Sequence, residues 1–294
     1  MKETIVLKFG GTSVSSYYNW QKISSLIEKY KKEYNVVIVI SALVGVTDKL
    51  ISVSSLETSY EQKDKLIYEI QQQHENLVEN CGIEIPEILK IRCDDIIELY
   101  KKNAKYFEPE LSANIIAYGE ILSSILGKFI LEKLNVNCNL IDTRDIIKVN
   151  YDYSKDIYSN FLDADINLSE LKYHNFEYEV VLMQGFICSK LHENKYKTCL
   201  LGRGGSDTCG SLIAYITNAK IYKIYKDVNG IYDKDPNKNK STKIYYNLSY
   251  DEAYNISLKG AKIIHHKCIE PLKEKKIVCI VKNINETVEF TTIS

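Results

Sequence analysis

The sequence feature that most constrains the fold is an unbroken apolar run, rich in β-branched residues, at 36–40. A run this short and continuous is typical of a strand buried on both faces, as in a parallel sheet. Other short apolar runs alternate with stretches of helical periodicity and lie at 5–7, 136–141, 180–186, 219–225 and 277–281, the last being the expected final strand. This alternation predicts a mostly parallel sheet with helices on both faces.

The chain has 294 residues, enough for one large α/β domain or two small ones, and no long linker or internal repeat interrupts it. We predict a single unit, 1–294, with an N-terminal lobe at about 1–190 and a C-terminal lobe at about 191–294. The polar helical stretch 54–105, broken at Pro86, is expected to be an insertion that covers the sheet. The net charge of −1 gives no broad attraction to nucleic acid or to an anionic membrane.

The 8 cysteines contain no C-x-x-C pair, and the 5 histidines are scattered, so we predict no metal site built by the protein alone. The first residues, 1–4, do not begin a secretory signal, and no apolar run is long enough to span a bilayer. Reduced cysteines in a cytoplasmic protein are the simplest interpretation.

A lysine and two glycines occupy a predicted strand-to-helix turn in the segment Lys8–Ser13. Glycines there let the backbone approach a ligand, and the helix that follows offers a positive N-terminus to an anion. The arrangement suits a phosphate. The alternative is an ordinary tight turn with a surface lysine.

A second glycine cluster, Gly202–Asp207, opens another predicted helix and places Arg203 between glycines. The planar fork of arginine binds carboxylate or phosphate, so this pattern favours a binding role. The loop Ser41–Asp48 follows a buried strand and brings two hydroxyls to the edge of the sheet where ligands gather. Thr47 or Asp48 could instead cap the next helix, and Glu120, in the apolar helical stretch 112–134, could simply be solvated.

These stretches together resemble the catalytic domain of aspartate kinases in the amino acid kinase superfamily. The matching segments, in order, are Lys8–Ser13, Ser41–Asp48, Gly119-Glu120, Gly202–Asp207, Asp227–Tyr232 with Asp235-Pro236, and Gly260-Ala261-Lys262. The resemblance implies a three-layer α/β/α sandwich around a mainly parallel eight-stranded sheet. It places the amino acid in the N-terminal lobe and the nucleotide in the C-terminal lobe.

The resemblance also implies a reaction, the transfer of the γ-phosphoryl group of ATP to the side-chain carboxylate of L-aspartate. The product would be 4-phospho-L-aspartate, at the entry to lysine, threonine and methionine synthesis, with Mg²⁺ carried on the phosphates. A carboxylate is already ionised at neutral pH, so the nucleophile needs no general base. The enzyme then has to align two anions and neutralise charge on the transferring group.

Carried over to this sequence, the resemblance gives each motif residue a role. Lys8 and Asp207 are the catalytic pair, in which Asp207 orients Lys8. The acceptor amino acid is expected to contact Ser41, Thr47, Glu120, Arg203 and Ser206, with Glu120 on its ammonium and Arg203 on its α-carboxylate. The nucleotide is expected to contact Lys8, Gly10, Gly11, Lys226, Asp227, Tyr232, Lys262 and Ile263. For three of these the simpler alternatives are a helix cap for Asp207, core packing for Tyr232 and a solvated side chain for Lys262.

The sequence departs from the family pattern at several positions. Lys226 stands where a threonine usually precedes the motif aspartate, a change that is tolerable if that position offers mainly its backbone. Asn237 stands where an arginine is usual, and this gap predicts weaker ATP binding. Lys267 replaces a proline and Cys188 replaces a glycine, and neither is expected to touch a proposed contact.

Aspartate kinases usually continue into two ACT regulatory domains, and this chain ends where they would begin. We therefore expect catalysis without built-in inhibition by lysine or threonine, and regulation, if any, through a separate subunit. The alternative is that the sequence is a piece of a longer protein. Dimerisation is a further expectation from the resemblance. Two rival functions stay open at this point: a kinase for another acid such as glutamate, and a non-catalytic sensor of amino acid or nucleotide.

Overall fold

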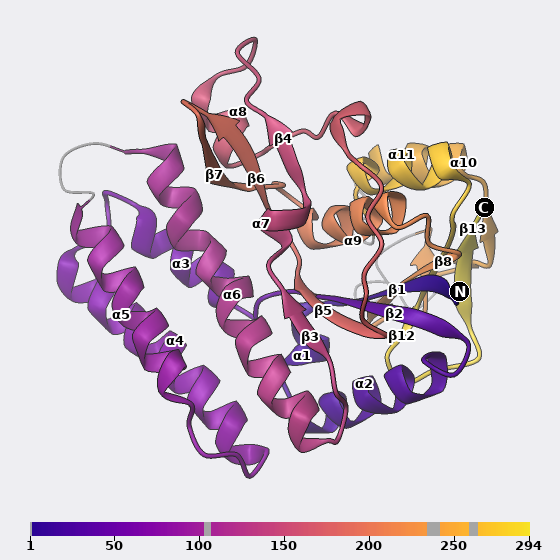
Figure 1. Ribbon diagram of the computed structural model, residues 1–294, viewed down its shortest axis with the longest axis horizontal. Helices are drawn as coiled ribbons and strands as arrows, with labels where there is room; N and C mark the ends of the chain where they lie inside the picture. The colour runs from indigo at the N-terminus through magenta and orange to yellow at the C-terminus, as the bar shows by residue number, and fades with distance from the viewer. Residues whose placement is uncertain (1, 103–106, 234–241, 259–263) are drawn as a thin grey trace.

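The computed structural model describes residues 2–102, 107–233, 242–258 and 264–294 (Figure 1). Its central sheet has 8 strands in the order β11-β13-β12-β8-β1-β2-β5-β3. In chain order these are β1 (Glu3–Phe9), β2 (Tyr34–Ile40), β3 (Asn139–Ile141), β5 (Val180–Gln184), β8 (Ile221–Lys226), β11 (Asn247–Leu248), β12 (Val278–Asn283) and β13 (Phe290–Ile293). Neighbouring strands are parallel except β12 and β13. The mainly parallel eight-stranded sheet predicted from the sequence is confirmed.

Helices cover both faces of this sheet and complete the three layers. In Figure 1, α2 (Tyr17–Tyr30) lies below the sheet, whereas α9 (Gly205–Ile216) and α11 (His266–Lys275) lie above it. The shorter helices are α1 (Gly11–Val14), α3 (Val46–Ser54), α7 (Thr143–Ile146), α8 (Ile157–Phe161) and α10 (Tyr250–Leu258). The apolar segments of β1 and β2 are almost completely buried between the layers, as the continuous run at 36–40 predicts.

The long helix α6 (Pro109–Lys133) packs against the α2 side of the sheet through two glycines. A Cβ at Gly119 would lie 2.9 Å from the Cβ of Ala42, and one at Gly127 would lie 2.6 Å from the Trp20 ring. Only hydrogen fits at these points, so the two contacts fix where α6 sits along its axis. Within the described residues α6 is also long and apolar enough to cross a membrane. However, 67% of its apolar 18-residue stretch is buried inside the protein, as in a core helix.

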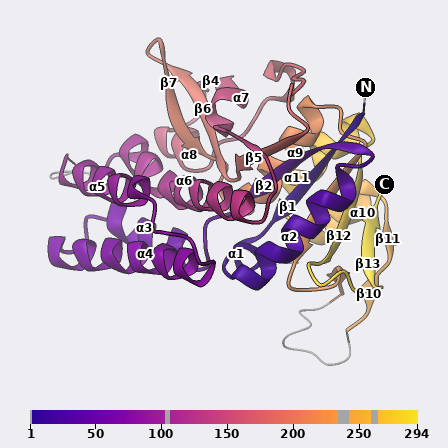
Figure 2. The same cartoon turned by 60° about the horizontal axis from the view of Figure 1, so that its bottom comes forward.

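The insertion predicted at 54–105 consists of α4 (Tyr60–Asn80) and α5 (Glu87–Lys102). They form an antiparallel pair that packs on α3 and α6 and projects away from the sheet (Figures 1 and 2). The prediction that this segment covers the sheet is therefore wrong. Its apolar residues face a helix layer, which has the same 3.6-residue signature as a sheet-covering helix.

The structure contains strands that the apolar runs do not predict. The polar residues 192–197 belong to the hairpin of β6 (Ile187–His192) and β7 (Lys195–Leu200), which joins β4 (Lys148–Asn150) in a separate sheet. Glu193 and Asn194 form its turn, with φ values of 50° and 60°. The segment 277–281 is followed by a further strand, β13, whose short and half-polar sequence hides its role at the sheet edge. A two-stranded ribbon, β9 (Ile231–Tyr232) with β10 (Ile244–Tyr245), completes the strands.

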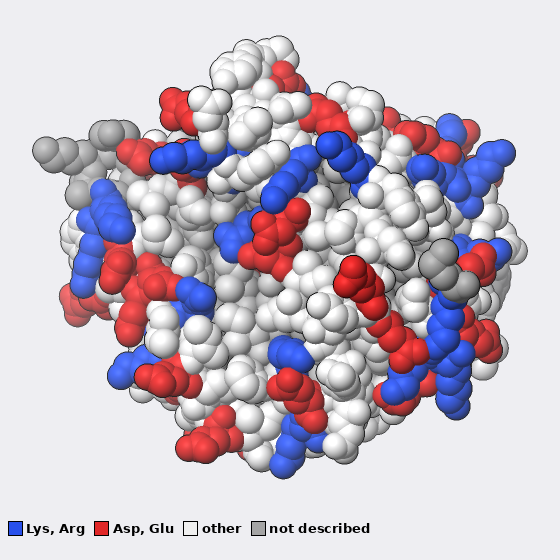
Figure 3. Space-filling view, in the orientation of Figure 1, with Lys and Arg blue, Asp and Glu red and all other residues white. Residues whose placement is uncertain are grey.

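Charged residues of both signs are interspersed on the face shown in Figure 3. Neither sign gathers there into a continuous region of the kind that attracts nucleic acid. This agrees with the nearly balanced composition of the chain, whose net charge is −1.

Candidate active site

The first predicted site residue, Lys8, lies near the carboxyl end of β1. β1 is a central strand, paired in parallel with β2 on one side and β8 on the other. Only 5% of Lys8 is exposed, so the ammonium group needs an anionic partner inside the protein. The alternative of a surface lysine in an ordinary turn is excluded.

The partner of Lys8 is Asp207, in the first turn of α9. Asp207 Oδ1 lies 2.6 Å from Lys8 Nζ, and its Oδ2 lies 2.9 Å from Lys226 Nζ. Burial by itself would raise the pKa of Asp207, but the charges of Lys226 and Lys8 outweigh it and lower that pKa to about 2. Asp207 is therefore a carboxylate at all ordinary pH values. The N-cap of α9 is Gly204, so Asp207 is not the helix cap.

The two glycines that follow Lys8 serve different purposes. Gly10 has φ −75° and is the N-cap of the four-residue helix α1, and a Cβ there would meet nothing closer than Lys8 Nζ at 3.7 Å. A Cβ at Gly11 would lie 2.8 Å from the carbonyl oxygen of Ala42. Close packing against the 41–48 loop thus explains Gly11 without a ligand.

The second glycine turn has a different backbone. Gly202 and Gly204 adopt φ values of 69° and 70°, the left-handed region that favours glycine. A Cβ at Gly204 would lie 2.5 Å from the Cβ of His265, so both conformation and space require glycine there. Arg203 projects from between them, is exposed, and forms no ion pair with the residues that the structure describes. Its guanidinium is available for an anion.

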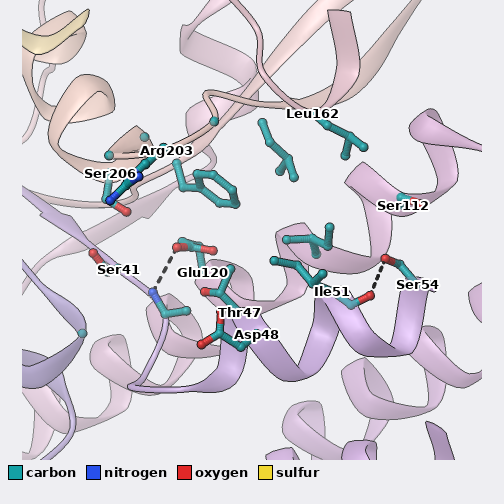
Figure 4. A pocket seen from close by; sticks show the side chains of 18 of the residues that line it. Ser41, Thr47, Asp48, Ile51, Ser54, Ser112, Glu120, Leu162, Arg203 and Ser206 are labelled. Atoms are coloured by element: carbon teal, nitrogen blue, oxygen red, sulfur yellow. Dashed lines mark hydrogen bonds between the residues drawn. The ribbon is translucent and has the colours of Figure 1, made fainter. Parts of the chain in front are cut away.

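Glu120 is the other buried carboxyl group of the site. It lies in the middle of α6, is 2% exposed, and accepts a hydrogen bond through Oε1 from the backbone N–H of Ala42 at 3.1 Å (Figure 4). Its Oε2 has no hydrogen-bond partner within the described part of the chain. Burial raises the pKa of Glu120 to about 8. The alternative of a solvated glutamate is wrong.

A cavity of about 820 Å³ joins these groups. The predicted residues that line it are Lys8, Gly11, Ser41, Thr47, Glu120, Arg203, Ser206 and Asp207. The structure thus brings the catalytic pair and all five predicted acceptor-binding residues to one hollow. Thr47 and Asp48 lie in the first turn of α3, whose N-cap is Gly45 with no side-chain cap, so neither residue caps that helix.

Apolar residues that the sequence motifs do not reveal also line the cavity. They are Ile51, Phe107, Ile116, Tyr158, Leu162, Phe186 and Leu200. In Figure 4, Ile51 and Leu162 lie across the cavity from Arg203 and Ser206. The seven residues come from separate helices, strands and loops, so only the folded chain brings them together, and no local pattern in the sequence marks them.

The predicted nucleotide residues lie differently. Asp227 is exposed just after β8, and its carbonyl oxygen accepts a hydrogen bond from Asn283 Nδ2 at 2.9 Å. Tyr232 is half-buried in the β9–β10 ribbon, and burial raises its pKa. Neither is among the residues that line the large cavity. Lys262, Ile263 and the departure at Asn237 lie outside the described residues.

Lys226 makes a side-chain contact that the sequence motif does not predict. A mainly backbone role is expected at this position, but the ammonium group of Lys226 pairs with Asp207. The signal lies in the strand alternation, because Lys226 follows Tyr222 and Ile224 on the same face of β8.

The residues present also limit how a metal could be held. Within the described ranges no group of three or more His, Cys, Asp or Glu side chains could hold a metal ion. All 8 cysteines are buried and unpaired.

Comparison with known proteins agrees with this geometry. The model of the amino acid kinase family matches residues 3–283. An aspartokinase of Chlamydia trachomatis is 30% identical over 98% of this chain and 64% of its own length. A bifunctional aspartokinase/homoserine dehydrogenase of Buchnera aphidicola is 28% identical over 98% of this chain and 36% of its own length. The chain thus spans between about a third and two thirds of these relatives.

Among solved structures, the chain is similar to E. coli aspartokinase III in complex with aspartate and ADP. The TM-score is 0.86 at 25% sequence identity, and the match covers 99% of this chain and 64% of that one. The fold described above therefore occurs in a protein crystallised with an amino acid and a nucleotide together.

Proposed function

Because the chain belongs to the amino acid kinase family, we propose that it transfers the γ-phosphoryl group of ATP to the side-chain carboxylate of L-aspartate. The product is 4-phospho-L-aspartate. The observation that carries the proposal is that one cavity is lined by two sets of groups: the Arg203 guanidinium and the Glu120 Oε2, neither of which has a partner among the described residues and which suit a free amino acid, and a buried lysine held by a carboxylate. The names of the relatives support aspartate as the acceptor.

The acceptor end suits the two charged groups that every free amino acid carries. The free Oε2 of Glu120 accepts a hydrogen bond from the substrate ammonium, whose charge also favours ionisation of the glutamate. The planar fork of Arg203 binds the α-carboxylate, and Ser41, Thr47 and Ser206 offer hydroxyls around it. Held at both charges, the substrate directs its side-chain carboxylate towards the rest of the cavity.

Lys8, held by Asp207, neutralises negative charge on the transferring phosphoryl group. The reacting carboxylate is ionised at neutral pH and needs no base, so the barrier lies in bringing two anions into line. Lys8 is fixed at the carboxyl end of β1 and faces the cavity, where its ammonium stabilises the negative oxygens of the transferring group. Mg²⁺ bound to the nucleotide would supply further neutralisation of the phosphate oxygens.

We propose the remaining features of the site on the same basis. The nucleotide contacts Gly10, Gly11, Asp227 and Tyr232, together with Lys262 and Ile263. One kinase domain then consists of an acceptor lobe at about 1–190 and a nucleotide lobe at about 191–294, with the cavity between them. Free, buried cysteines fit a protein of the reducing cytoplasm.

The direct test is hydroxamate formation from ATP, hydroxylamine and either aspartate or glutamate. We expect the purified chain to act on aspartate and Lys8→Ala to lose activity by roughly a hundred-fold or more. A preference for glutamate would move the assignment to another acid. Equal signals from the chain and Lys8→Ala would reject phosphoryl transfer and favour a sensor.

A further inference from the structure

Two lysines from neighbouring strands point to the same carboxylate. In the parallel pairing of β1 with β8, Lys8 lies opposite Ile224, and Lys226 is two residues further along β8. Side chains alternate between the faces of a strand, so Lys226 and Ile224 share the face of Lys8. This is the face on which α9 packs and presents Asp207.

The opposite face of the same two strands fixes this alternation. Phe9 and Tyr225 are paired in register, and their rings stack with centroids 4.9 Å apart and planes 11° from parallel. Both residues are fully buried. A shift of either strand by one residue would break this stack and would turn Lys8 or Lys226 away from α9, so the placement of both lysines is specified by the core.

β8 holds Asp207 at two points. The hydroxyl of Tyr222 donates to the backbone carbonyl oxygen of Asp207 at 2.9 Å, which fixes the first turn of α9 on the sheet. Lys226 Nζ donates to Asp207 Oδ2 at 2.9 Å, while Lys8 Nζ lies 2.6 Å from Oδ1. Each carboxylate oxygen is thus assigned to one ammonium group, and rotation of the carboxylate would weaken both ion pairs.

We propose that Lys226 is a positioning residue that occupies one oxygen of Asp207, so that Lys8 is held through the other oxygen alone and keeps its ammonium directed into the cavity. The inference rests on the proposed kinase function. The cavity lining within the described residues includes Lys8 and Asp207 but not Lys226, which is why Lys226 acts through Asp207. Without Lys226, Asp207 is free to rotate and to bind Lys8 through both oxygens, which draws the ammonium away from a phosphate.

The groups around Asp207 support this division. Besides Lys8 and Lys226, the titratable side chains that face it are Tyr222 on β8, Cys268 on α11 and Cys279 on β12. Burial raises the pKa of each of these three far above neutrality, so they stay uncharged. Only the two lysines compensate the charge of Asp207 among these groups, and the charge of Lys226 lowers its pKa along with that of Lys8.

The first experiment needs no activity. The carboxyl carbon of Asp207 is titrated by NMR in the unliganded chain and in Lys226→Met, Lys226→Arg and Lys223→Met, with Asp207→Asn identifying the resonance. Lys223 is the matched control, since it lies on the other face of β8 and donates to the Tyr30 hydroxyl at 2.6 Å. We expect Lys226→Met to raise the Asp207 pKa by about one pH unit or more and the other two variants to leave it near the wild-type value. An unchanged pKa in Lys226→Met overturns the proposal.

The second experiment reads the consequence for turnover. Lys226→Met should lower kcat for aspartate phosphorylation by roughly ten- to hundred-fold, with KM for aspartate within about two-fold and activity restored by Lys226→Arg. In an Asp207→Asn background, Lys226→Met should lower kcat no further. Two results would mean that Lys226 contacts the nucleotide directly and would overturn the proposal: an equal loss of kcat in the Asp207→Asn background, or ADP binding weakened about ten-fold with the Asp207 pKa unchanged. If the wild type fails to phosphorylate aspartate, the proposed function is wrong, and the NMR titration of Asp207 still tests whether Lys226 binds and orients that carboxylate.

Discussion

Two buried carboxyl groups line the cavity, and they differ in almost every physical respect. Asp207 lies between two lysines, and their charges lower its pKa to about 2 despite its burial. Glu120 has one backbone donor and an Oε2 without a partner among the described residues, and burial raises its pKa to about 8.

Asp207 has cationic partners within the protein, whereas the Oε2 of Glu120 has no hydrogen-bond partner among the described residues. Asp207 lies within ion-pair distance of two lysines, so it organises the charges around it. Glu120 is buried with a hydrogen bond to only one of its oxygens among the described residues, and its ionised form becomes more favourable when an ammonium group arrives. Substitutions of Asp207 and Glu120 should therefore affect different kinetic parameters.

The largest effect on activity is expected from substitution of Asp207. Asp207→Asn leaves two lysines without their common anion, so Lys8 loses its fixed position. We expect kcat to fall by roughly a hundred-fold or more, with a smaller change in KM for aspartate. Steady-state kinetics test this, with Asp251→Asn as the control because that side chain is 73% exposed in a surface ion pair with Lys273. A loss confined to KM would contradict the organising role.

The next largest effect belongs to Glu120→Gln. The amide keeps the shape and the bond to Ala42 but removes the charge that meets the ammonium. We expect KM for aspartate to rise by roughly ten- to hundred-fold, because a hydrogen bond between charged groups is lost, while kcat at saturation changes little. A fall in kcat without a change in KM would place Glu120 at the reacting end instead.

The pH dependence of acceptor binding sharpens the comparison further. Free Glu120 is protonated below a pKa of about 8 and must lose its proton to bind an ammonium. Aspartate binding should therefore tighten as pH rises, by up to about ten-fold per pH unit between pH 6 and 8. Calorimetric titrations at several pH values test this, and Glu120→Gln should abolish the dependence. The pKa of Asp207 lies too low to contribute in this range.

The smallest effect concerns the stability of the empty protein. The pKa of Glu120 is higher in the folded chain than in the unfolded chain, so its contribution to stability is present at low pH and is lost as pH rises towards 8. Asp207 behaves oppositely, and its contribution is lost only as pH falls from about 4 to about 2. Glu120→Gln should thus raise Tm by a few degrees relative to wild type at pH 8.5 and by less at pH 6. A variant that is less stable at pH 8.5 would show that the glutamate is not destabilising there.

Much of this arrangement could be read from the sequence. The turn at Lys8 and the cluster with Arg203 and Asp207 follow strands and open helices, and such positions gather at the edge of a sheet where ligands bind. Local sequence carries this information because each of these motifs sits at the end of its own element. Glu120 lies in the middle of α6, and only the family resemblance marks it. The fold class followed for the same reason from the alternation of apolar runs with helical segments.

The rest depends on packing between elements. Three features can be identified only when elements that are distant in the chain are placed against one another. They are the apolar lining of the cavity, the close contact of Gly11 with Ala42 and the ion pair of Lys226 with Asp207. The pair α4–α5 was misplaced because amphipathic periodicity shows that a face is buried but not which neighbour buries it. Short strands such as β13 are too brief and too polar to stand out from a loop.

The glycines at 119 and 127 of α6 impose a limit on how this molecule can change length. Each admits a neighbour so closely that a side chain could not fit, and Glu120 directly follows the first of them. One residue inserted between these positions would turn the two halves of the helix by about 100° relative to one another. Either the tryptophan contact or the orientation of the glutamate would be lost, so tolerated insertions should occur in the surface loops and not within this stretch of helix.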